Sequence, residues 1–593
     1  MYYCLLEISV IGMLHIARLS SRTVQAFSLS PNPARTRILP TLPGRSALFS
    51  TSTSDDDVDE SVQRYVVIHK NNQSMNFRNG SPLIFSGSVE KTIQIGIDDD
   101  ADADESKIPM GSLVGIVVSS KNSERPPAKR GGGGRGGGGR GKGKAQKETK
   151  VDYKHYAVDK EDGITEEYDI NGEYLSTIED ASQLQQALEE GKLIGFGFFN
   201  PVSMYRAFIF CHEANYKDLF KEINVMFKTS TGSNKEKTEK VIEMVMKAKI
   251  QDAIRSRMLQ NLPSSSTDSY RLVNGEGDGL SGMAVDIMGG KVAVVMASAS
   301  WVEIYKETIM KVMRQVLDSH PIYGADEESA LDIVWRNTPM RLKQDGYEFP
   351  EEDEAVEEDE DSTPVILTEN KIKYYTYPYD KSSQKTGFYC DQRENRYNLA
   401  MNCKDKNVLD LCCYNGGFAL NAMIHGGAKS CIGVDSSQDA VNAASENAKL
   451  NGVDSDSIQF VKRDITDYMK DATDAGKEFD VIILDPPKLA PTVTALERAT
   501  RKYHQLNRDA IRLINSKEGG LLLTCTCSGA MTQKNGGQYF LETIKVAALA
   551  AGRRITLLRS SGAAPCHTQC PASFPANAYL TAALFYISPE SED

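Results

Sequence analysis

The sequence lacks the features of secreted disulfide-rich proteins and of membrane-spanning proteins. Its 593 residues include 11 cysteines without the paired spacing of a disulfide framework, so we expect a reduced interior. No segment after residue 17 is apolar over the length that a bilayer requires, and we expect no membrane partner. Cys566-His567-x-x-Cys570 has no second Cys/His pair at zinc-finger spacing, so we predict no metal site.

Acidic residues are absent between Glu7 and Asp55. This stretch is rich in arginine and serine, and it overlaps an apolar segment of signal-peptide length, Leu5–Ala17. The combination resembles the two-part presequences of algae with secondary plastids, with Val24–Phe27 as the internal cleavage point. We expect residues 1–54 to direct the chain to an organelle, a plastid rather than a mitochondrion, and secretion is the distant alternative.

The net charge of −13 would disfavour a nucleic acid partner if it were spread evenly. Much of it lies in three acidic clusters of the kind found in solvated loops: Asp55–Glu60, Asp98–Glu105 and Glu351–Asp361. Net charge therefore does not exclude RNA. The tract Arg130–Lys144 is instead cationic and glycine-rich and cannot form a core. It is either a sequence-indifferent RNA contact or a linker, and the residues leave both open.

The remaining pattern predicts three structured parts. Apolar runs bounded by turn residues over Tyr65–Ser119 indicate a small β domain, and the pattern resumes at Leu193–Phe210. We assign 64–214 to this domain, with an insertion at about 120–190 that holds the Arg/Gly tract and is expected to be disordered. Residues 215–375 form a central α+β domain with an acidic loop at 345–362, and residues 376–593 form the last domain, whose motifs are described below.

The central domain shows no catalytic constellation. We expect helical structure from Tyr216 to about Leu262, and then two strands joined by a tight turn within Tyr270–Asp286. The turn is dense in glycine and acid, but its spacing does not match a calcium-binding EF-hand. A strand at Lys291–Ala297 and a helix at Trp301–Leu317 follow, and an acidic loop leads to about Asn370.

The most informative stretch runs from Asn407 to Asp435. It predicts a buried strand at Val408–Cys412, a turn at Asn415–Gly417, a helix and a second strand that ends in Asp435, which together form a βαβ unit. Adjacent glycines let a backbone pass close to a ligand, and a carboxylate after the second strand can hold a ribose. The turn is not G-x-G-x-x-G, which favours an adenosine with a sulfonium and an amino acid over a dinucleotide. The alternative is a nucleotide-free unit whose glycines serve packing.

Polar side chains also follow the next predicted strands. One strand precedes Asp464, and Phe479–Leu484 delivers Asp485, which two prolines then hold rigidly. At this edge Asp485 can accept hydrogen bonds from the amino group of a nucleobase. A fifth strand at Gly520–Thr524 is followed by Cys527 in a C-T-C-S-G turn, which is the position of a nucleophile. Buried structural cysteine is the commoner use of this residue.

A polar segment, Lys381–Arg396, lies directly before the βαβ unit. The order F-x-x-D-Q-R would let Arg393 and Asp391 face the carboxylate and amino groups of an amino acid ligand. The alternative is a capped helix start, in which Thr386 is the cap and Arg396 is solvated.

These motifs together resemble those of one family. S-Q-K-T-G-F-Y-x-D-Q-R-x-N-R, the Y-x-G-G-F loop, D-P-P-K and T-C-x-C-S-G look like the bacterial large-subunit ribosomal RNA cytosine-5 methyltransferases with an amino-terminal PUA domain. The resemblance continues in Phe85–Val89, Gly197–Arg206 and Arg271–Asp286, and so spans most of residues 64–590. The presequence, the Arg/Gly insertion and the acidic loops depart from it. Relatives include enzymes that methylate guanine N7 in the same RNA.

The resemblance implies a class I methyltransferase fold: a Rossmann-like α/β domain whose doubly wound sheet has seven strands, the last one antiparallel. It implies that 64–214 is PUA-like and that RNA, in particular large-subunit rRNA, is the partner. Asp410 and the loop Tyr414–Phe418 would hold the methionine part of S-adenosyl-L-methionine, Asp435 the ribose and Asp464 the adenine amine. The whole implied cofactor-binding set is Thr386, Gly387, Phe388, Asp391, Arg393, Asp410, Tyr414, Gly416, Phe418, Asp435 and Asp464.

The implied reaction needs a nucleophile, because carbon 5 of cytosine does not attack a methyl group unless a thiolate first adds to carbon 6. We assign this role to Cys527 and the orientation of the base to Asp485. The residues do not identify the base that removes the C5 proton. The alternatives are methylation of guanine N7 or another nitrogen, which needs no nucleophile, and a non-catalytic RNA-binding assembly factor. The oligomeric state is not determined, and a homodimer is one option.

Overall fold

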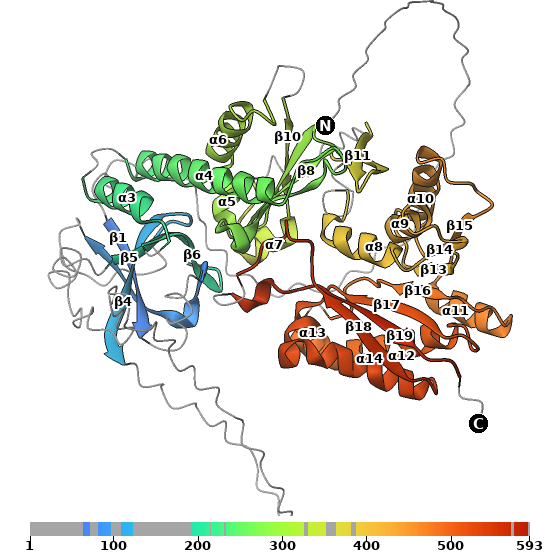
Figure 1. Ribbon diagram of the computed structural model, residues 1–593. Helices are drawn as coiled ribbons and strands as arrows, with labels where there is room; N and C mark the ends of the chain where they lie inside the picture. The colour runs from blue at the N-terminus through green and yellow to red at the C-terminus, as the bar shows by residue number, and fades with distance from the viewer. Residues whose placement is uncertain are drawn as a thin grey trace, which may run out of the picture. The chain divides into compact units, whose positions relative to one another are not determined.

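The computed structural model describes residues 63–70, 81–95, 108–122, 193–213, 215–229, 233–324, 330–350, 363–380, 387–490, 492–570 and 574–590 (Figure 1). The predicted presequence, the Arg/Gly tract, Thr386 and residues 351–362 of the predicted acidic loop lie outside these residues.

Six strands form the first sheet: β1 (Gln63–Lys70), β2 (Leu83–Phe85), β3 (Val89–Ile95), β4 (Leu113–Asn122), β5 (Leu193–Phe199) and β6 (Tyr205–His212). Their order is β2-β6-β5-β4-β1-β3. β4 pairs antiparallel with β5, so the chain resumes beside the strand at which the predicted insertion begins. A Cβ on Gly115 of β4 would lie 2.8 Å from the ring of Tyr65, so a side chain there would collide with the neighbouring strand. The small β domain is present, and its PUA-like identity stays a prediction.

The next part combines helices with a four-stranded sheet of order β10-β9-β8-β7. Its elements are α3 (Lys217–Thr229), α4 (Asn234–Leu259), β7 (Tyr270–Asn274), β8 (Met283–Met288), β9 (Val292–Ala297), α5 (Ser300–Ile304), α6 (Lys306–Asp318), β10 (Asp332–Asn337) and α7 (Pro339–Gln344). β7 and β8 pair antiparallel, which confirms the two predicted strands. The predicted tight turn between them is wrong, because residues 275–282 connect them and include a 3-10 helix at Gly275–Asp278.

The single helix predicted over Trp301–Leu317 is wrong, because the chain breaks it at Tyr305 into α5 and α6. Tyr305 has φ −104° and ψ 23°, outside the helical region, and its O–H donates to the carbonyl oxygen of Gly111 at 3.0 Å. A contact with a residue 194 positions away therefore accompanies the break, and local periodicity could not reveal it.

A two-stranded hairpin, β11 (Val365–Glu369) and β12 (Ile372–Thr376), precedes the catalytic domain and was not predicted. Its turn residues, Asn370 and Lys371, have φ of 52° and 68°. Positive φ at both central residues is the conformation of the commonest two-residue hairpin turn. The sequence therefore contained a signal for this hairpin, because Asn370 lies between two short segments in which apolar and polar residues alternate.

The catalytic domain holds a seven-stranded sheet of order β15-β14-β13-β16-β17-β19-β18. The strands are β13 (Asn407–Leu411), β14 (Ser430–Asp435), β15 (Ile458–Lys462), β16 (Val481–Leu484), β17 (Gly520–Thr526), β18 (Ile555–Ser561) and β19 (Thr581–Ile587). The first five are parallel, and β19 inserts antiparallel between β17 and β18. This confirms the predicted seven-stranded sheet with an antiparallel last strand.

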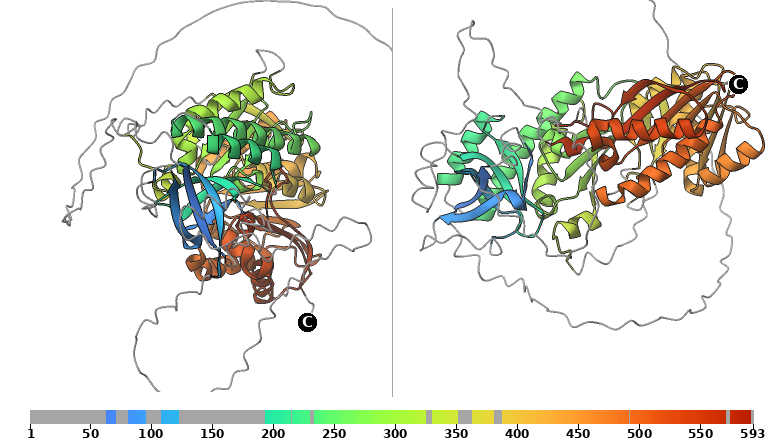
Figure 2. Two further views of the ribbon diagram at one scale, coloured as in Figure 1. Left: turned by 90° about the vertical axis from the view of Figure 1, so that its left-hand side faces the viewer. Right: turned by 90° about the horizontal axis from the view of Figure 1, so that it is seen from below.

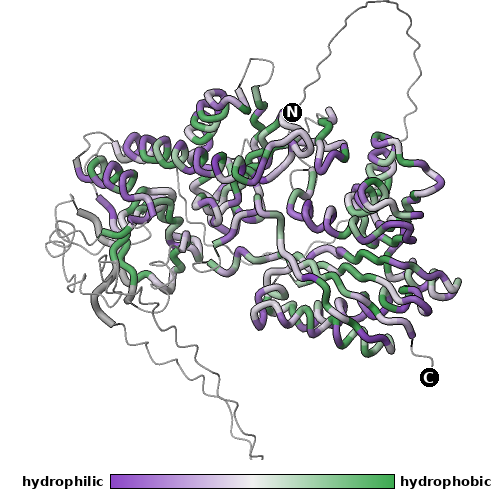
Figure 3. Tube along the Cα trace, viewed as in Figure 1, coloured by the Kyte–Doolittle hydropathy of each residue, from purple (hydrophilic) through white to green (hydrophobic). Residues whose placement is uncertain are grey.

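Helices cover both faces of this sheet (Figure 1 and Figure 2). On one side are α8 (Arg393–Ala400), α9 (Gly417–Ile424) and α10 (Gln438–Leu450); on the other are α11 (Ile465–Asp474), α12 (Leu496–Arg512) and α14 (Gln538–Ala550). Val481 and Ile483 of β16 belong to the first core, and Ile482 and Leu484 belong to the second. A strand buried on both faces is apolar throughout, as the hydropathy of the central strands in Figure 3 shows.

The cysteines of the described residues are reduced, as the sequence predicted. All ten cysteines among them are free thiols. Within the described ranges, no helix combines the length with the apolar character that crossing a membrane requires.

Candidate active site at the carboxyl edge of the sheet

The parallel strands bring most of the predicted site residues to one edge of the seven-stranded sheet. Leu411, Leu484 and Thr524 lie in register on β13, β16 and β17, so the residues after them share the edge at which open α/β sheets bind ligands. The residues fall along the edge in two groups: Asp464, Asp435 and Asp410 on the side of β15, β14 and β13, and Asp485 and Cys527 on the side of β16 and β17.

The turn after β13 is strained and closely packed. Cys412, Tyr414 and Gly416 have φ of 66°, 48° and 82°, a region that residues with side chains rarely adopt. The turn is tied to the end of β14, because the Tyr414 backbone N–H donates to Asp435 Oδ2 at 3.0 Å. A Cβ on Gly416 would lie 3.1 Å from the ring of Phe460. Backbone strain of this kind concentrates at ligand-binding sites.

Asp410 lies within β13 and is completely buried. Its Oδ2 accepts a hydrogen bond from the Ala419 backbone N–H at 3.1 Å, and its Oδ1 has no partner among the described residues. Burial raises the pKa of Asp410 to about 8; the Ala419 N–H lowers it, and the carboxylates of Asp485 and Asp435 raise it. A buried polar atom without a partner is costly, and a cationic donor from a ligand would satisfy it.

Asp435 ends β14 and Asp464 follows the neighbouring strand β15, but the two carboxylates are held differently. Asp435 is half-buried, and its Oδ1 accepts from the Ser437 backbone N–H at 2.9 Å, so that backbone donors orient both of its oxygens. Asp464 is exposed and caps α11 through Oδ1, which accepts from the backbone N–H groups of Thr466 at 2.7 Å and Asp467 at 3.3 Å. Partial burial raises the pKa of Asp464, but the cap bonds outweigh it and the net shift is downward. Both keep lone pairs for further donors.

The segment before α8 contacts the glycine turn. The Tyr414 O–H donates to the carbonyl oxygen of Gly387 at 3.4 Å, and the rings of Tyr389 and Tyr414 meet edge to face at 5.1 Å. Phe388 and Phe418 are buried in the same apolar core, under α8 and α9. The predicted segment and the predicted turn are therefore brought together.

Asp391 and Arg393 are buried, and both make hydrogen bonds within the protein. Asp391 accepts from the Tyr579 O–H at 2.8 Å. Arg393 donates to Glu394 at 2.8 and 2.9 Å, and its Nη1 lies 3.6 Å from Cys566 Sγ. Their contacts with an amino acid ligand stay a prediction, and Thr386 lies outside the described residues.

Arg396 is not solvated, so this part of the capped-helix alternative is wrong. Its Nε and Nη2 donate to the two carboxylate oxygens of Glu369, each at 2.8 Å, and Nη2 also donates to the carbonyl oxygen of Tyr389 at 2.7 Å. Both side chains are buried. Glu369 ends β11 and belongs to no motif, so the sequence gave no signal for this pair.

The other half of the edge carries Asp485 and Cys527, both half-buried. Because the last residue of β16 pairs with Thr524, Asp485 follows β16 beside Cys525, and Cys527 lies two residues further out. Cys525 is completely buried, and burial raises the pKa of its thiol well above the usual range. Of the two cysteines in the C-T-C-S-G turn, only Cys527 is therefore partly accessible.

Hydrogen bonds hold the residues on either side of Cys527. The hydroxyls of Thr526 and Tyr503 are 2.8 Å apart, and Ser528 Oγ donates to the carbonyl oxygen of Ala490 at 2.5 Å. Burial raises the pKa of Tyr503, and the nearby Cys527 and Asp485 raise it further although the Thr526 bond lowers it. The Tyr503 phenol thus stays protonated near Cys527 and Asp485.

Sequence reasoning overlooked two residues at this end. Gln392 Nε2 donates to Asp485 Oδ2 at 3.0 Å. Burial raises the pKa of Tyr389, and Tyr414, Asp391, Cys527 and Asp485 raise it further. Both residues belong to F-Y-C-D-Q-R, of which only Phe388, Asp391 and Arg393 were predicted to be site residues.

Among the described residues, no three His, Cys, Asp or Glu side chains are grouped so that they could hold a metal ion. Cys566 Sγ lies 3.5 Å from His567 Nδ1, whereas Cys570 donates to the carbonyl oxygen of Glu276 at 3.7 Å. The C-H-x-x-C stretch thus makes contacts within the protein.

Comparisons with known proteins agree with this geometry. A family model of S-adenosylmethionine-dependent methyltransferases matches residues 361–551. Ribosomal RNA large subunit methyltransferase I of Cronobacter sakazakii is 34% identical over 315 residues, which are 53% of this chain and 73% of the relative. The protein of that name from Aeromonas salmonicida is 35% identical over 308 residues, 51% of this chain and 72% of the relative.

A solved structure described as a SAM-dependent methyltransferase from Streptococcus mutans has the same fold. It is superposed with a TM-score of 0.54 at 16% identity, over 88% of this chain and all of the other. The catalytic domain therefore has the Rossmann-like fold of class I methyltransferases, and the protein is an enzyme whose cofactor is S-adenosyl-L-methionine. The chain belongs to the family of S-adenosylmethionine-dependent methyltransferases that includes ribosomal RNA large subunit methyltransferase I.

Proposed function

We propose that this enzyme methylates carbon 5 of a cytosine in large-subunit ribosomal RNA. The names of its relatives support ribosomal RNA as the substrate. One observation supports the target atom: a partly accessible cysteine, Cys527, follows β17 close to Asp485 at the edge of the sheet. Methylation of a nitrogen needs no nucleophile, whereas methylation of this carbon does.

The first half of the edge offers groups that fit S-adenosyl-L-methionine. The partnerless Oδ1 of Asp410 suits the amino group of the methionine part, beside the strained turn Cys412–Gly417. Asp435 would accept from the ribose hydroxyls and Asp464 from the adenine amine, since Asp435 ends β14 and Asp464 follows β15 at this edge. When bound, the cofactor supplies a methyl group that is electrophilic because it is attached to a sulfonium.

The second half of the edge supplies the nucleophile. The Cys527 thiolate adds to C6 of the cytosine, which breaks the C5–C6 double bond and makes C5 nucleophilic. Once C5 carries the methyl group, its proton leaves to a base, the C5–C6 double bond re-forms and the Cys527 thiolate departs. Asp485 orients the ring by accepting a hydrogen bond from the exocyclic amine. A cytosine within a helix has to leave the stack to reach this edge.

The experiment is methyl transfer from labelled S-adenosyl-L-methionine to large-subunit rRNA, with the modified nucleoside identified by mass spectrometry. We expect labelled 5-methylcytosine at a defined position. Labelled N7-methylguanine or another N-methylated base would contradict the target atom. Binding of rRNA without any labelled nucleoside would favour a non-catalytic assembly factor.

We also propose that the six-stranded sheet of residues 63–212 is a PUA-like domain that contacts the same RNA. The motifs within β2 to β3 and β5 to β6 support this, since they are the ones that resemble PUA-containing relatives. Crosslinking of the full chain to rRNA should mark peptides of this sheet as well as peptides near Cys527. Crosslinks confined to the catalytic domain would contradict the assignment.

The proposed cellular location is an organelle, a plastid in the first place. Support comes from the acid-free, arginine-rich stretch within residues 1–54, which lies outside the described residues. A fluorescent protein fused to residues 1–60 should enter the plastid, or else the mitochondrion. A diffuse cytosolic signal would refute the proposal.

A further inference from the structure

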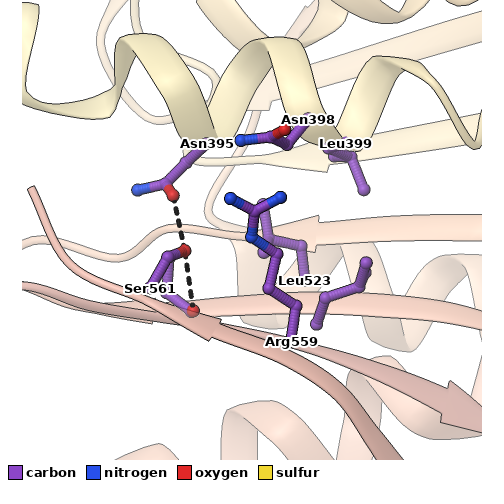
Figure 4. A pocket seen from close by; sticks show the side chains of 8 residues that line it. Asn395, Asn398, Leu399, Leu523, Arg559 and Ser561 are labelled. Atoms are coloured by element: carbon purple, nitrogen blue, oxygen red, sulfur yellow. Dashed lines mark hydrogen bonds between the residues drawn. The ribbon is translucent and has the colours of Figure 1, made fainter. Parts of the chain in front are cut away.

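A chain of hydrogen bonds that runs through two buried amide side chains ends on the Asp485 carboxylate. Gln392 Nε2 donates to Asp485 Oδ2 at 3.0 Å, and Asn395 Nδ2 donates to Gln392 Oε1 at 2.7 Å. Ser561 Oγ donates to Asn395 Oδ1 at 2.7 Å, a bond that Figure 4 shows beside a small pocket between α8 and the sheet. We call Gln392, Asn395 and Ser561 the amide relay.

The relay has a fixed direction, because every group in it donates toward Asp485. Asn395 uses its two N–H groups on Gln392 and on the carbonyl oxygen of Gly562 at 3.0 Å, so its oxygen accepts from Ser561. Gln392 accepts with its oxygen, so its nitrogen must face Asp485. Hydrogen bonds aligned in this way polarise one another, and they stabilise negative charge at the end that accepts.

A purely structural role explains only part of this arrangement. Asn395 lies on α8 and Ser561 at the end of β18, so their bond attaches the helix to the edge of the sheet. Gln392 is not needed for that attachment. It is buried at 5% exposure, and it turns its donor group to Asp485. A buried amide of this kind orders the groups that it joins.

We propose that Gln392, held by Asn395 and Ser561, is a positioning residue that keeps the Asp485 carboxylate ionised and correctly turned toward the target base. The inference rests on the proposed function, in which Asp485 orients the cytosine. Gln392 acts through Asp485 and is not itself a catalytic residue.

The test compares Gln392→Leu and Gln392→Glu in the full-length protein. Leucine is similar in size but donates no hydrogen bond, and the loss of a bond to a charged group should lower kcat by roughly 10- to 100-fold. Binding of S-adenosyl-L-methionine should stay close to that of the wild type, and the melting temperature should fall only modestly, because Asn395 Nδ2 loses one acceptor. Asn398→Ala is the matched control, because Asn398 lies on α8 and lines the same pocket without belonging to the relay.

The glutamate variant adds a readout that a structural role would not change. A glutamic acid donates to Asp485 only when it is protonated, so Gln392→Glu should regain activity, relative to the wild type, as the pH falls below 7. Gln392→Leu should show no such recovery. The wild type in the same buffers accounts for the other titratable groups around Asp485, which are Asp410, Cys412, Tyr389, Tyr503, Cys525 and Cys527.

The outcomes separate this proposal from the proposed function. If the wild type forms no 5-methylcytosine, the proposed function fails, and the base-orienting role with it. If the wild type forms 5-methylcytosine and Gln392→Leu keeps its kcat, only the relay proposal is overturned. A loss of cofactor binding and thermal stability in parallel with kcat, without acid recovery in Gln392→Glu, would also overturn it in favour of a structural role.

Discussion

The guanidinium of Arg396 binds the carboxylate of Glu369 through two hydrogen bonds of 2.8 Å, and neither side chain is more than 5% exposed. Burial raises the pKa of Glu369, and the Arg396 charge opposes that rise. The pair joins the β11–β12 hairpin to α8, and Arg396 also holds the carbonyl oxygen of Tyr389 at 2.7 Å. The segment that carries Tyr389 and Gln392 is thereby fixed to the hairpin.

Arg396→Leu should destabilise the folded protein by about 3–5 kcal/mol, because the Glu369 charge would stay buried without a partner. The measurement is chemical denaturation of the wild type and the variant. The double variant Arg396→Leu/Glu369→Leu should recover much of the loss, since it removes the buried charge as well. A double variant as unstable as the single one would show that lost packing, not the unpaired charge, causes the effect.

Asp410 should make cofactor binding depend on pH. Its pKa is raised to about 8, so below that pH the cofactor's ammonium has to displace a proton to pair with the carboxylate. Affinity for S-adenosylhomocysteine, which has the same amino acid tail, should therefore rise from pH 6 to pH 8 with release of protons. Calorimetry in buffers of different ionisation enthalpy measures both. Asp410→Asn should bind without this proton release, and an unchanged release would assign it to another group.

The same group should also affect folding stability, with the opposite sign. The pKa of the Asp410 carboxyl rises from 3.8 in the unfolded chain to about 8 in the folded one. Between these pH values the folded state therefore binds one proton that the unfolded state has released. Its contribution to the free energy of unfolding is therefore fully present below about pH 4 and is lost as the pH rises through 8. Asp410→Asn should flatten that decline in denaturation experiments, and a decline as steep as in the wild type would contradict the assignment.

Asp435→Ala should weaken cofactor binding by roughly 1.5–3 kcal/mol, as expected for loss of hydrogen bonds to a charged acceptor. Its carboxylate also holds the Tyr414 and Ser437 backbone N–H groups, so part of the loss would come from a less ordered turn. Asp439→Ala is the control, because it removes the same negative charge from an exposed position in the first turn of α10. Equal calorimetric affinities of the two variants for the cofactor would show that Asp435 does not contribute to cofactor binding.

Much of the edge could be predicted because parallel strands impose it. Val481–Leu484 is a short apolar run that had to be buried on both faces, and the polar residue after it, Asp485, had to emerge at the carboxyl edge. The same argument placed Asp435, Asp464 and Cys527. Local pattern, strand direction and one topological rule were enough, and none of them depends on a distant contact.

The contacts that orient these residues could not be predicted. Ser561 follows Asn395 by 166 positions, and Glu369 precedes Arg396 by 27, so no local period links either pair. Whether Gln392 faces Asp485 or solvent depends on β18 returning beside α8, which is a property of the whole sheet. The helix break at Tyr305 has the same origin, because its hydroxyl contacts Gly111. Element types follow from neighbours in sequence, and side-chain orientation follows from neighbours in space.

The Arg/Gly tract should add RNA affinity without adding specificity. Arg130–Lys144 is cationic and contains no aromatic residue that could stack on a base. Deletion of the tract should weaken rRNA binding and make it less sensitive to salt, because fewer counterions are released. The modified nucleotide should stay the same. Transfer of methylation to another nucleotide in the deletion variant would show instead that the tract positions the RNA.

The sharpest prediction concerns the two cysteines after and within β17. A 5-fluorocytosine at the target position cannot lose its C5 substituent as a proton, so the bond from Cys527 to C6 should persist as a covalent enzyme–RNA adduct. Cys527→Ser should lose both turnover and adduct, because a hydroxyl is a far poorer nucleophile than a thiolate.

Cys525→Ser is the matched control for that variant. The side chains of residues 525 and 527 are expected on the same face of the sheet, because they are two positions apart along the strand. Cys525 is completely buried, and its raised pKa keeps the thiol protonated. Cys527 is partly accessible beyond the end of the strand. The Cys525 variant should therefore still form the adduct on denaturing gels. Full methylation by Cys527→Ser would exclude the nucleophilic mechanism and favour methylation of a nitrogen. Loss of the adduct in Cys525→Ser alone would keep the mechanism and transfer the nucleophile's role to Cys525, which would require β17 to open at its end before the base can bind.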